Sequence, residues 1–266
     1  MTRARHAFTC SLVLCGVAFV SACGGGVPLL HSAHALAPGQ TSTGVGISDR
    51  FVLGGERAAL DDARLRMPGA EPDAHANRGA LVALVEGPAL APWAAARVGL
   101  PGTNEAGLSY SGEALRADAR HAFESGQSAL SLGFGLTGRG FGHDPIDLPG
   151  ARRERATGYG VDVPVLVGYR TDANLISVWG GVRAGYDRWS GHVDLEPDRD
   201  CALDARRLSA GSLLGVAVGV SPLWVALELE LDYAHVTGHV TQPGADGSET
   251  IDGWSVRPAG ALIGKF

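Results

Sequence analysis

From Ala106 onward, apolar and more polar residues alternate in segments of about ten residues that are separated by turn-forming residues. The clearest segment is 159–169, in which tyrosine or valine occupies every second position. Successive side chains of a β-strand point to opposite faces, so this pattern predicts a strand with one uniformly apolar face. Ten steps of about 3.3 Å, tilted by about 40°, span roughly 25 Å, which is the height of the apolar band of a membrane barrel.

Other segments repeat this pattern with charges on the more polar face. Leucine alternates with Glu228, Glu230 and Asp232, and the segments 115–123, 130–137 and 176–187 alternate in the same way. A soluble β-sandwich would have strands of about five or six residues and more charge on its outer faces. The sequence therefore predicts an all-β fold, an antiparallel up-and-down transmembrane β-barrel.

The lengths of the connections predict the topology. Short links occur at 102–104, 125–126, 171–174 and 221–222, whereas long polar links occur at 139–157, 190–205 and 238–249. Outer-membrane barrels place short turns in the periplasm and longer loops outside. Counting back from the last strand gives about ten strands, with eight to twelve possible, and a first strand near 40–51.

An insertion of residues 54–90 separates the first strand from the strand near Trp93. Residues 56–67 have helical content and end at Pro68, so we expect an extracellular loop that carries a short helix. Residues 80–85 are expected to extend the second strand.

The last segment, 254–266, alternates and ends in Phe266. This ending resembles the C-terminal signal of bacterial outer-membrane β-barrel proteins. The resemblance implies insertion by the barrel-insertion machinery into the outer membrane of a Gram-negative bacterium, with the lipids of that membrane as partners. Pro258 fits an edge or a bulge better than the middle of a strand.

The first residues have the form of a secretory leader. Arg3 and Arg5 precede an apolar run at 7–19, and such a run of about 13 residues is too short for a membrane span of roughly 20. The run from Val20 to Cys23 resembles a bacterial lipoprotein signal. The resemblance implies removal of residues 1–22 and a lipid on Cys23.

The predicted lipid anchor faces the periplasm, residues 23–39 form a flexible linker, and residues 40–266 form the barrel. An ordinary signal peptide, in which Cys23 carries no lipid, is the alternative. Cys10 and Cys15 would be removed with the leader, which leaves Cys201 without a partner for a disulfide.

The amino-acid composition agrees with a chain that forms many β-strands. Glycine accounts for 39 of 266 residues and charged residues for 19%, against about a quarter charged residues in soluble domains. The net charge of −6 and the lack of a basic run argue against a nucleic-acid partner.

The inward faces carry charges of both signs in nearly equal number. A ten-stranded barrel is only slightly wider than the eight-stranded case that side chains fill. Because a buried unpaired charge costs several kcal/mol, we expect ion pairs across the lumen, with Arg257 close to Glu230 or Asp232. The predicted lumen network consists of Arg97, Arg116, Asp118, Arg120, Asp162, Arg183, Asp187, Glu228, Glu230, Asp232 and Arg257.

No residue pattern predicts a cofactor, a metal or a catalytic group. His235 and His239 have a spacing that could place two metal ligands on one face, but a third ligand is not evident. His143 and Asp144 lie in a loop and are similar in placement to the rim residues of omptins, which are outer-membrane proteases. Interfacial anchoring explains the five tryptophans, which are Trp93, Trp179, Trp189, Trp224 and Trp254.

The sequence therefore predicts a non-enzymatic outer-membrane β-barrel lipoprotein with a structural or surface-interaction role and a plugged lumen. A narrow solute channel and a rim-located hydrolase are the alternatives. The sequence does not identify a ligand of the extracellular loops.

Overall fold

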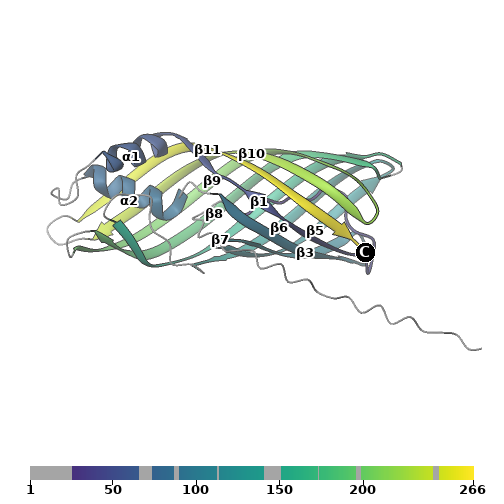
Figure 1. The fold of residues 1–266 in the computed structure, drawn as a ribbon, viewed down its shortest axis with the longest axis horizontal. Helices are drawn as coiled ribbons and strands as arrows, with labels where there is room; N and C mark the ends of the chain where they lie inside the picture. Colours follow the sequence, from purple (N-terminus) through teal and green to yellow (C-terminus); the bar gives the residue numbers. More distant parts are fainter. Residues whose placement is uncertain are drawn as a thin grey trace, which may run out of the picture.

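The computed structural model describes residues 26–65, 74–86, 90–112, 114–140, 151–172, 174–195, 199–241 and 246–266. Within these ranges, ten antiparallel strands form a barrel that closes where β1 pairs with β11 (Figure 1). The strands are β1 (Thr41–Ser48), β3 (Ala91–Leu100), β4 (Asn104–Ser111), β5 (Ala114–Ser125), β6 (Ser128–Arg139), β7 (Ala151–Arg170), β8 (Ile176–Leu195), β9 (Arg199–Val220), β10 (Leu223–Thr241) and β11 (Gly247–Lys265).

The predicted fold class and the strand number are thus confirmed. One further short strand, β2 (Phe51–Gly54), pairs with residues 253–256 of β11, whereas β1 pairs with residues 259–265 of the same strand. Pro258 lies in this interval, and its carbonyl accepts a hydrogen bond from the backbone nitrogen of Asp49 at 3.0 Å. The missing N–H of the proline faces the same side as that carbonyl, so it removes no donor from the pairing with β10.

The barrel has a low wall and a high wall. Strands β3 to β6 contain 8–12 residues, whereas β7 to β11 contain 19–22 residues. We call the end that holds the short turns and Phe266 the lower end, and the opposite end the upper end. The helices lie at the upper end and the C-terminus at the lower end (Figure 1).

Strand pairing continues far into the segments that the sequence predicts as long loops. In the range 139–157, β7 begins at Ala151, and in the range 190–205, β8 ends at Leu195 and β9 begins at Arg199. The third loop, 238–249, is likewise shortened by β10 and β11. The predicted loops are too long because loss of the apolar alternation does not mark the end of a strand. Hydrogen bonding between strands does not require an apolar face.

Two helices pack against the inner face of the high wall. Helix α1 (Gly55–Arg64) largely overlaps the predicted helical range 56–67, and α2 (Ala74–Glu86) follows it. The expectation that 80–85 extends a strand is wrong, since a short apolar run does not distinguish a strand from a buried helix. The hairpin buries apolar side chains against Trp189, Leu203, Val236, Val240 and Ile251.

Residues 26–36, which the sequence predicts as part of a flexible linker, lie inside the lumen and are mostly buried. Leu29, Leu30 and Ala33 are at most 2% exposed and belong to one apolar cluster with Trp93 and Trp179 of the wall. The segment makes no strand pairing. We call residues 26–36 the plug. None of the helices in the described ranges is long and apolar enough to cross a membrane.

The tryptophans correct the prediction of interfacial anchoring. Trp93, Trp179, Trp189 and Trp224 are at most 7% exposed and face the lumen, whereas only Trp254 of the five lies on the outer face, at 47% exposure. Glycine makes room for the inward rings: a Cβ at Gly215 would overlap the ring of Trp179. Position near a strand end did not reveal which face carries the ring.

Candidate functional site

The lumen contains the chemically richest group of side chains in the described residues. Arg97 of β3 bonds Glu105 of β4 and Asp118 of β5, and its Nη2 lies 2.5 Å from a carboxylate oxygen of Asp118. Arg116 continues the chain of ion pairs, at 2.7 Å from Asp118 and at 2.9 Å from both carboxylate oxygens of Asp162 on β7. The Arg116–Asp162 contact is therefore bidentate, the geometry that suits a guanidinium and a carboxylate.

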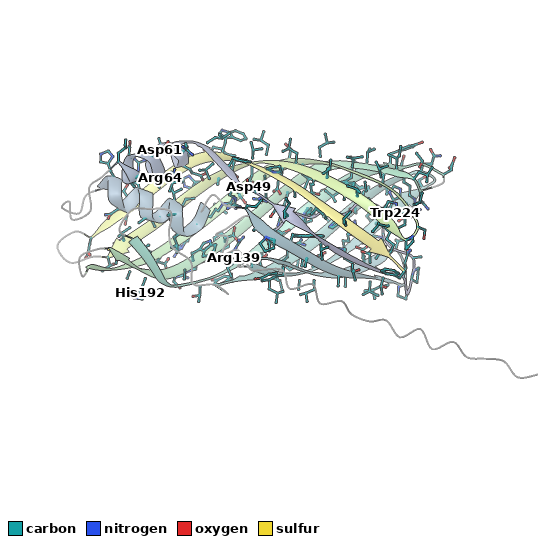
Figure 2. All side chains as sticks on the ribbon, in the orientation of Figure 1. Asp49, Asp61, Arg64, Arg139, His192 and Trp224 are labelled. Atoms are coloured by element: carbon teal, nitrogen blue, oxygen red, sulfur yellow. The ribbon has the colours of Figure 1, made fainter. Side chains whose placement is uncertain are left out.

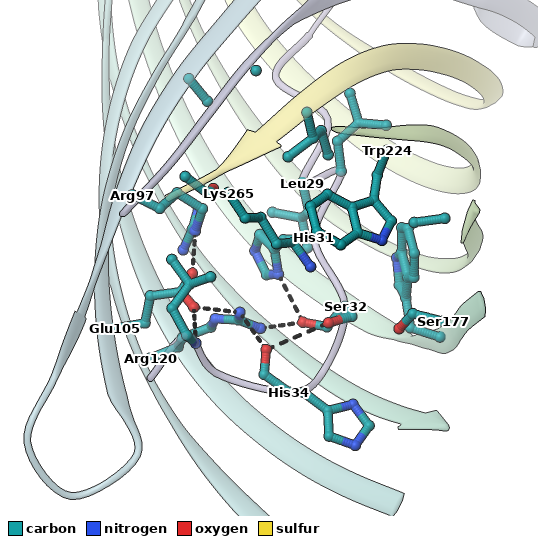
Figure 3. A pocket seen from close by; sticks show the side chains of 18 of the residues that line it. Leu29, His31, Ser32, His34, Arg97, Glu105, Arg120, Ser177, Trp224 and Lys265 are labelled. Atoms are coloured by element: carbon teal, nitrogen blue, oxygen red, sulfur yellow. Dashed lines mark hydrogen bonds and ion pairs between the residues drawn. The ribbon is translucent and has the colours of Figure 1, made fainter. Parts of the chain in front are cut away.

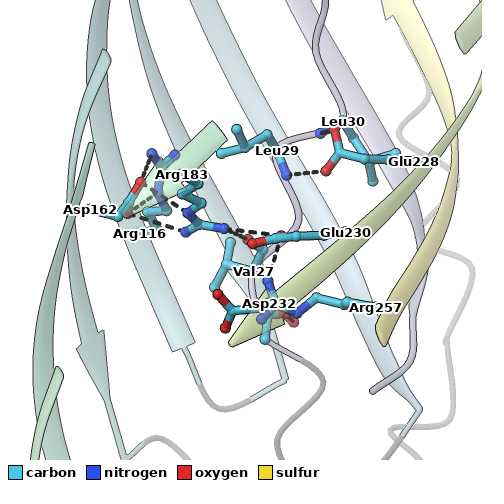
Figure 4. Close-up of polar contacts among 12 residues, drawn as sticks. Val27, Leu29, Leu30, Arg116, Asp162, Arg183, Glu228, Glu230, Asp232 and Arg257 are labelled. Atoms are coloured by element: carbon cyan, nitrogen blue, oxygen red, sulfur yellow. Dashed lines mark hydrogen bonds and ion pairs between the residues drawn. The ribbon is translucent and has the colours of Figure 1, made fainter. Parts of the chain in front are cut away.

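The same network continues along the inner face of the high wall. Arg183 of β8 lies 3.2 Å from Asp162 and 3.6 Å from Glu230 of β10 (Figure 4). Arg257 of β11 lies 2.6 Å from Glu230, so the last hairpin brings together the pair named from the sequence. Opposite charges on different strands thus link the low wall to the high wall.

A second group of ion pairs lies inside the lumen, closer to the upper end of the barrel. Asp187 of β8 accepts from Arg139 at 3.0 Å and from Arg207 at 3.3 Å, and Arg207 also bonds Asp232. The guanidinium of Arg139 lies 5.1 Å from the ring centre of Trp189. Sequence reasoning missed both arginines. Continuing the alternation of β9 past Leu208 would have placed Arg207 inside, whereas Arg139 had been assigned to a loop.

Glu228 differs from the other lumen carboxylates of the predicted network because it binds main chain. Its two carboxylate oxygens accept hydrogen bonds from the backbone nitrogens of Leu29 at 2.8 Å and Leu30 at 2.9 Å (Figure 4). The indole nitrogen of Trp179 donates to the same carboxylate at 3.1 Å. Three donors thus surround Glu228, which is 4% exposed.

Other wall charges also hold the backbone of the plug. Arg120 donates to the carbonyl of His34 at 2.9 Å and to that of Ser32, and it pairs with Glu105 at 2.8 Å (Figure 3). Arg183 donates to the carbonyl of Val27 at 2.9 Å. The remaining contacts to the plug are Ser111 Oγ to Gly26 O at 2.5 Å, Ala35 N to Glu124 Oε1 at 2.8 Å and Leu36 N to Glu105 Oε2 at 2.9 Å.

Little free space surrounds these contacts. One cavity of about 50 Å³ lies beside His31, Trp93 and Lys265, and another of about 30 Å³ lies among the charges near Arg257 and Asp162. A single water needs roughly 10–15 Å³ of such space, so each cavity holds a few waters at most. The two cavities thus offer no room for a larger solute.

The arrangement determines what the lumen can do chemically. Each carboxylate of the predicted network contacts a cation or main-chain donors, which satisfies the requirement for a buried charge. All eleven residues of that network face the lumen. At the lower end, Lys265 Nζ lies 4.7 Å from the ring centre of Trp224, which Figure 2 labels at the opposite end from Asp61 and Arg64. Within the parts of the chain that the structure describes, ion pairs and the plug thus occupy the lumen.

The two histidines singled out in the sequence lie on the outer face of β10. His235 Nδ1 lies 2.7 Å from Asp252, and His239 Nδ1 lies 3.1 Å from Ser248 Oγ. Four steps along a strand separate their Cα atoms by about 13 Å, which is too far for a shared metal ion. In the described part of the chain, no group of three or more His, Cys, Asp or Glu residues could hold a metal.

Other sequence candidates fall elsewhere. Cys23, His143 and Asp144 lie outside the described residues. Cys201 forms no disulfide within the described residues, and it is 1% exposed. Phe266 joins the seam of the barrel: its backbone nitrogen donates to Thr41 O at 2.8 Å, and Thr41 N donates back at 2.9 Å.

Comparison with known proteins gives an architectural likeness only. No protein-family model and no curated protein matches the sequence. One similar solved structure is Neisserial surface protein A, with 11% identity over 85% of this chain and 96% of that chain and a TM-score of 0.34. A major outer membrane protein from Thermus thermophilus has 12% identity over 85% of this chain and 99% of that chain, with a TM-score of 0.38. Ail, the attachment invasion locus protein of Yersinia pestis, has 12% identity over 85% of this chain and 99% of that chain, with a TM-score of 0.29. At these values nothing about the role of this chain follows.

Proposed function

We propose that this protein is a non-enzymatic outer-membrane β-barrel whose lumen is closed at rest, with a structural or surface-interaction role in the cell envelope. The observation that carries the proposal is the band of exposed apolar side chains around the outside of the barrel. On β10, the outward residues from Leu223 to Leu231 are leucine or valine, and each is 41–57% exposed. On β6, the outward residues from Leu130 to Leu136 are 43–54% exposed.

Aromatic residues bound this band. Tyr233 and Trp254 meet edge to face at 5.2 Å between ring centres, and the next outward residues above them, His235 and Asp252, are polar. Near the lower end, Tyr169 lies on the outer face. Soluble monomers rarely expose continuous apolar patches larger than a few hundred Å², so hydrocarbon is the environment that this surface fits.

The high wall supports a surface role. Strand β10 continues from Tyr233 to Thr241, and its outward side chains in this part are polar. Together with α1 and α2, the upper parts of β7 to β11 form a folded body beyond the apolar band. We propose that this body faces the outside of the cell and presents the interaction surface.

Lipidation of Cys23 is the finer part of the proposal, and the leader pattern supports it. The plug places a condition on it. Gly26 is held by Ser111, the last residue of β4, which stands about 18 Å above the lower end, since seven steps of about 3.3 Å rise at a tilt of about 40°. Three residues reach at most about 11 Å. A lipid on Cys23 therefore cannot reach the periplasmic leaflet while the plug fills the lumen.

Electrophoresis and membrane flotation test the barrel itself. The folded protein should migrate differently before and after boiling in detergent, and it should float with reconstituted lipid vesicles. The barrel-insertion machinery and outer-membrane lipids are the proposed partners. A stable monomer in aqueous buffer without detergent would overturn the proposal, because the apolar band would then face water.

A further inference from the structure

The wall of the barrel closes without help from the plug. Strand β1 pairs with β11 from Ser42 to Ser48 and with β3 from Thr41 to Ser48, so the seam consists of strand pairing alone. By contrast, the backbone of the plug is held by side chains of the wall, among them Glu228, Arg120 and Arg183. Withdrawal of the plug would therefore break no strand pairing.

A turn at the lower rim connects the plug to β1. Gln40 N donates to Ala37 O at 2.9 Å, and the backbone nitrogen of Gly39 donates to Gly99 O at 2.9 Å. Gly39 has a φ of +81°, a conformation that glycine adopts without strain, and a Cβ there would meet nothing within 4 Å. The turn at Ala37–Gly39 is thus exposed and held to the rim at Gly99, with the plug on its inner side.

The groups that hold the plug are well suited to water as a replacement. Of the eight main-chain contacts described above, all but the one from Ser111 come from charged side chains, and such groups bind water strongly when a peptide leaves them. Because the contacts are to backbone atoms, they do not depend on one particular side chain of the plug. The space left by the plug would be lined by charges of both signs and, beside the present positions of Leu29, Leu30 and Ala33, by apolar residues of the wall.

From these observations we propose that the lumen is a conduit for ions and small hydrophilic solutes, and that residues 26–36 are its gate, which swings toward the lower end about Ala37–Gly39. The inference rests on the proposed membrane barrel and extends it: the resting state is closed, and the open state is the one in which Cys23 could reach the periplasmic leaflet.

A cysteine pair tests the gate directly. A Cβ at Gly168 of β7 would lie 2.9 Å from the Cβ of Ala33, and a disulfide needs about 3.5–4.5 Å, so a small shift suffices. In planar bilayers in potassium chloride, the full chain should show brief current steps. The variant Ala33→Cys/Gly168→Cys should show none when oxidised and should regain them when reduced. Its matched control, Ala33→Ser/Gly168→Ser, should open equally under both conditions.

A second variant tests the grip on the plug. Glu228→Gln should raise the open fraction about tenfold, the factor that follows from losing one charge-assisted hydrogen bond. Current that persists in the oxidised cysteine pair, or an absence of current in wild type and Glu228→Gln alike, would overturn the gate. In protein that also carries Cys23→Ser, and therefore no lipid, failure of the two thiols to cross-link would also contradict the gate, because the closed state places these positions side by side. Heat-dependent migration of the same variants reports separately on the barrel.

Discussion

The carboxylate of Glu228 on β10 lies 2.8 Å from the backbone nitrogen of Leu29, 199 residues earlier in the chain. This contact joins a segment without regular structure to the middle of the high wall. The sequence predicts Glu228 as a member of an ion-pair network, but in the structure its carboxylate accepts hydrogen bonds from the main chain of the plug. Wall and plug together therefore make the interior of this barrel, and variants of either should affect the other.

Truncation of a plug side chain should cost as much as truncation in a protein core. Leu30 is 1% exposed, so Leu30→Ala should lower the free energy of unfolding by about 2–5 kcal/mol. Urea titration of the barrel in lipid vesicles, followed by tryptophan fluorescence, measures the change. Leu65→Ala, at a residue that is 84% exposed, is the control. Equal stability of the two variants would mean that the plug is not packed in the lumen.

The position of the apolar band predicts the cost of a charge on the outer face. Val165 lies near the middle of the apolar segment 159–169 on the outward face of β7, and Val165→Arg should impair assembly by about 2–4 kcal/mol, the cost of a cation at the mid-plane. Thr237→Arg adds the same charge to the outer face of β10 above Tyr233 and should be tolerated. The fraction that shows heat-dependent migration measures assembly. Similar yields from the two variants would contradict the assigned band.

Removal of one partner from the lumen network should cost more than removal of a pair. Arg116 is 1% exposed and bonds both Asp118 and Asp162. Arg116→Met should destabilise the barrel by about 3–5 kcal/mol, because Asp118 and Asp162 would each lose one guanidinium partner and buried negative charge would be left in excess. Adding Asp162→Asn should restore part of this loss in the same urea titration.

Arg188 provides the control for this network, since its pair with Asp204 at 3.1 Å is on the exposed face. Arg188→Met should change the unfolding midpoint little, because water and salt screen exposed pairs. If Arg116→Met and Arg188→Met behave alike, the lumen charges are solvated and the interior is not closed.

The packing of the helical hairpin should protect it from proteases. Leu81 of α2 is fully buried, and its side chain fills the space beside Gly238 of β10. Leu81→Asp should release the hairpin and allow trypsin to cleave at Arg57 or Arg78 on intact cells, while the β-barrel still inserts. Leu65→Asp, at an exposed position, should leave the cleavage rate unchanged. Cleavage that is equally fast in wild type would show that the hairpin is not packed.

Labelling with radioactive palmitate tests the lipid on Cys23. Wild type should incorporate label and Cys23→Ser should not, whereas Cys201→Ser should retain it. Because an acylated Cys23 in the periplasmic leaflet requires a withdrawn plug, labelled molecules carrying Ala33→Cys/Gly168→Cys should fail to cross-link. An absence of label in wild type would favour the ordinary signal peptide.

The faces of the strands could be predicted because alternation is a local property. A side chain two residues away lies on the same face whatever the rest of the chain does. The alternation around Glu230 therefore sufficed to place it inside. The last hairpin predicted Arg257 close to Glu230 or Asp232, and the structure selects Glu230. The same rule fails where the outer face becomes polar, which is why the sequence predicts loops in the upper parts of β7 to β11.

What the sequence by itself determined is the barrel: its class, its ten strands and the division of its residues between an apolar outside and a charged inside. Only the tertiary structure decided what fills that inside. The plug has no periodicity, and its partners lie on strands as far as 199 residues away, so nothing local to residues 26–36 announces them. Likewise, the helical form of α2 and the inward direction of Trp179 depend on the space that distant strands leave open.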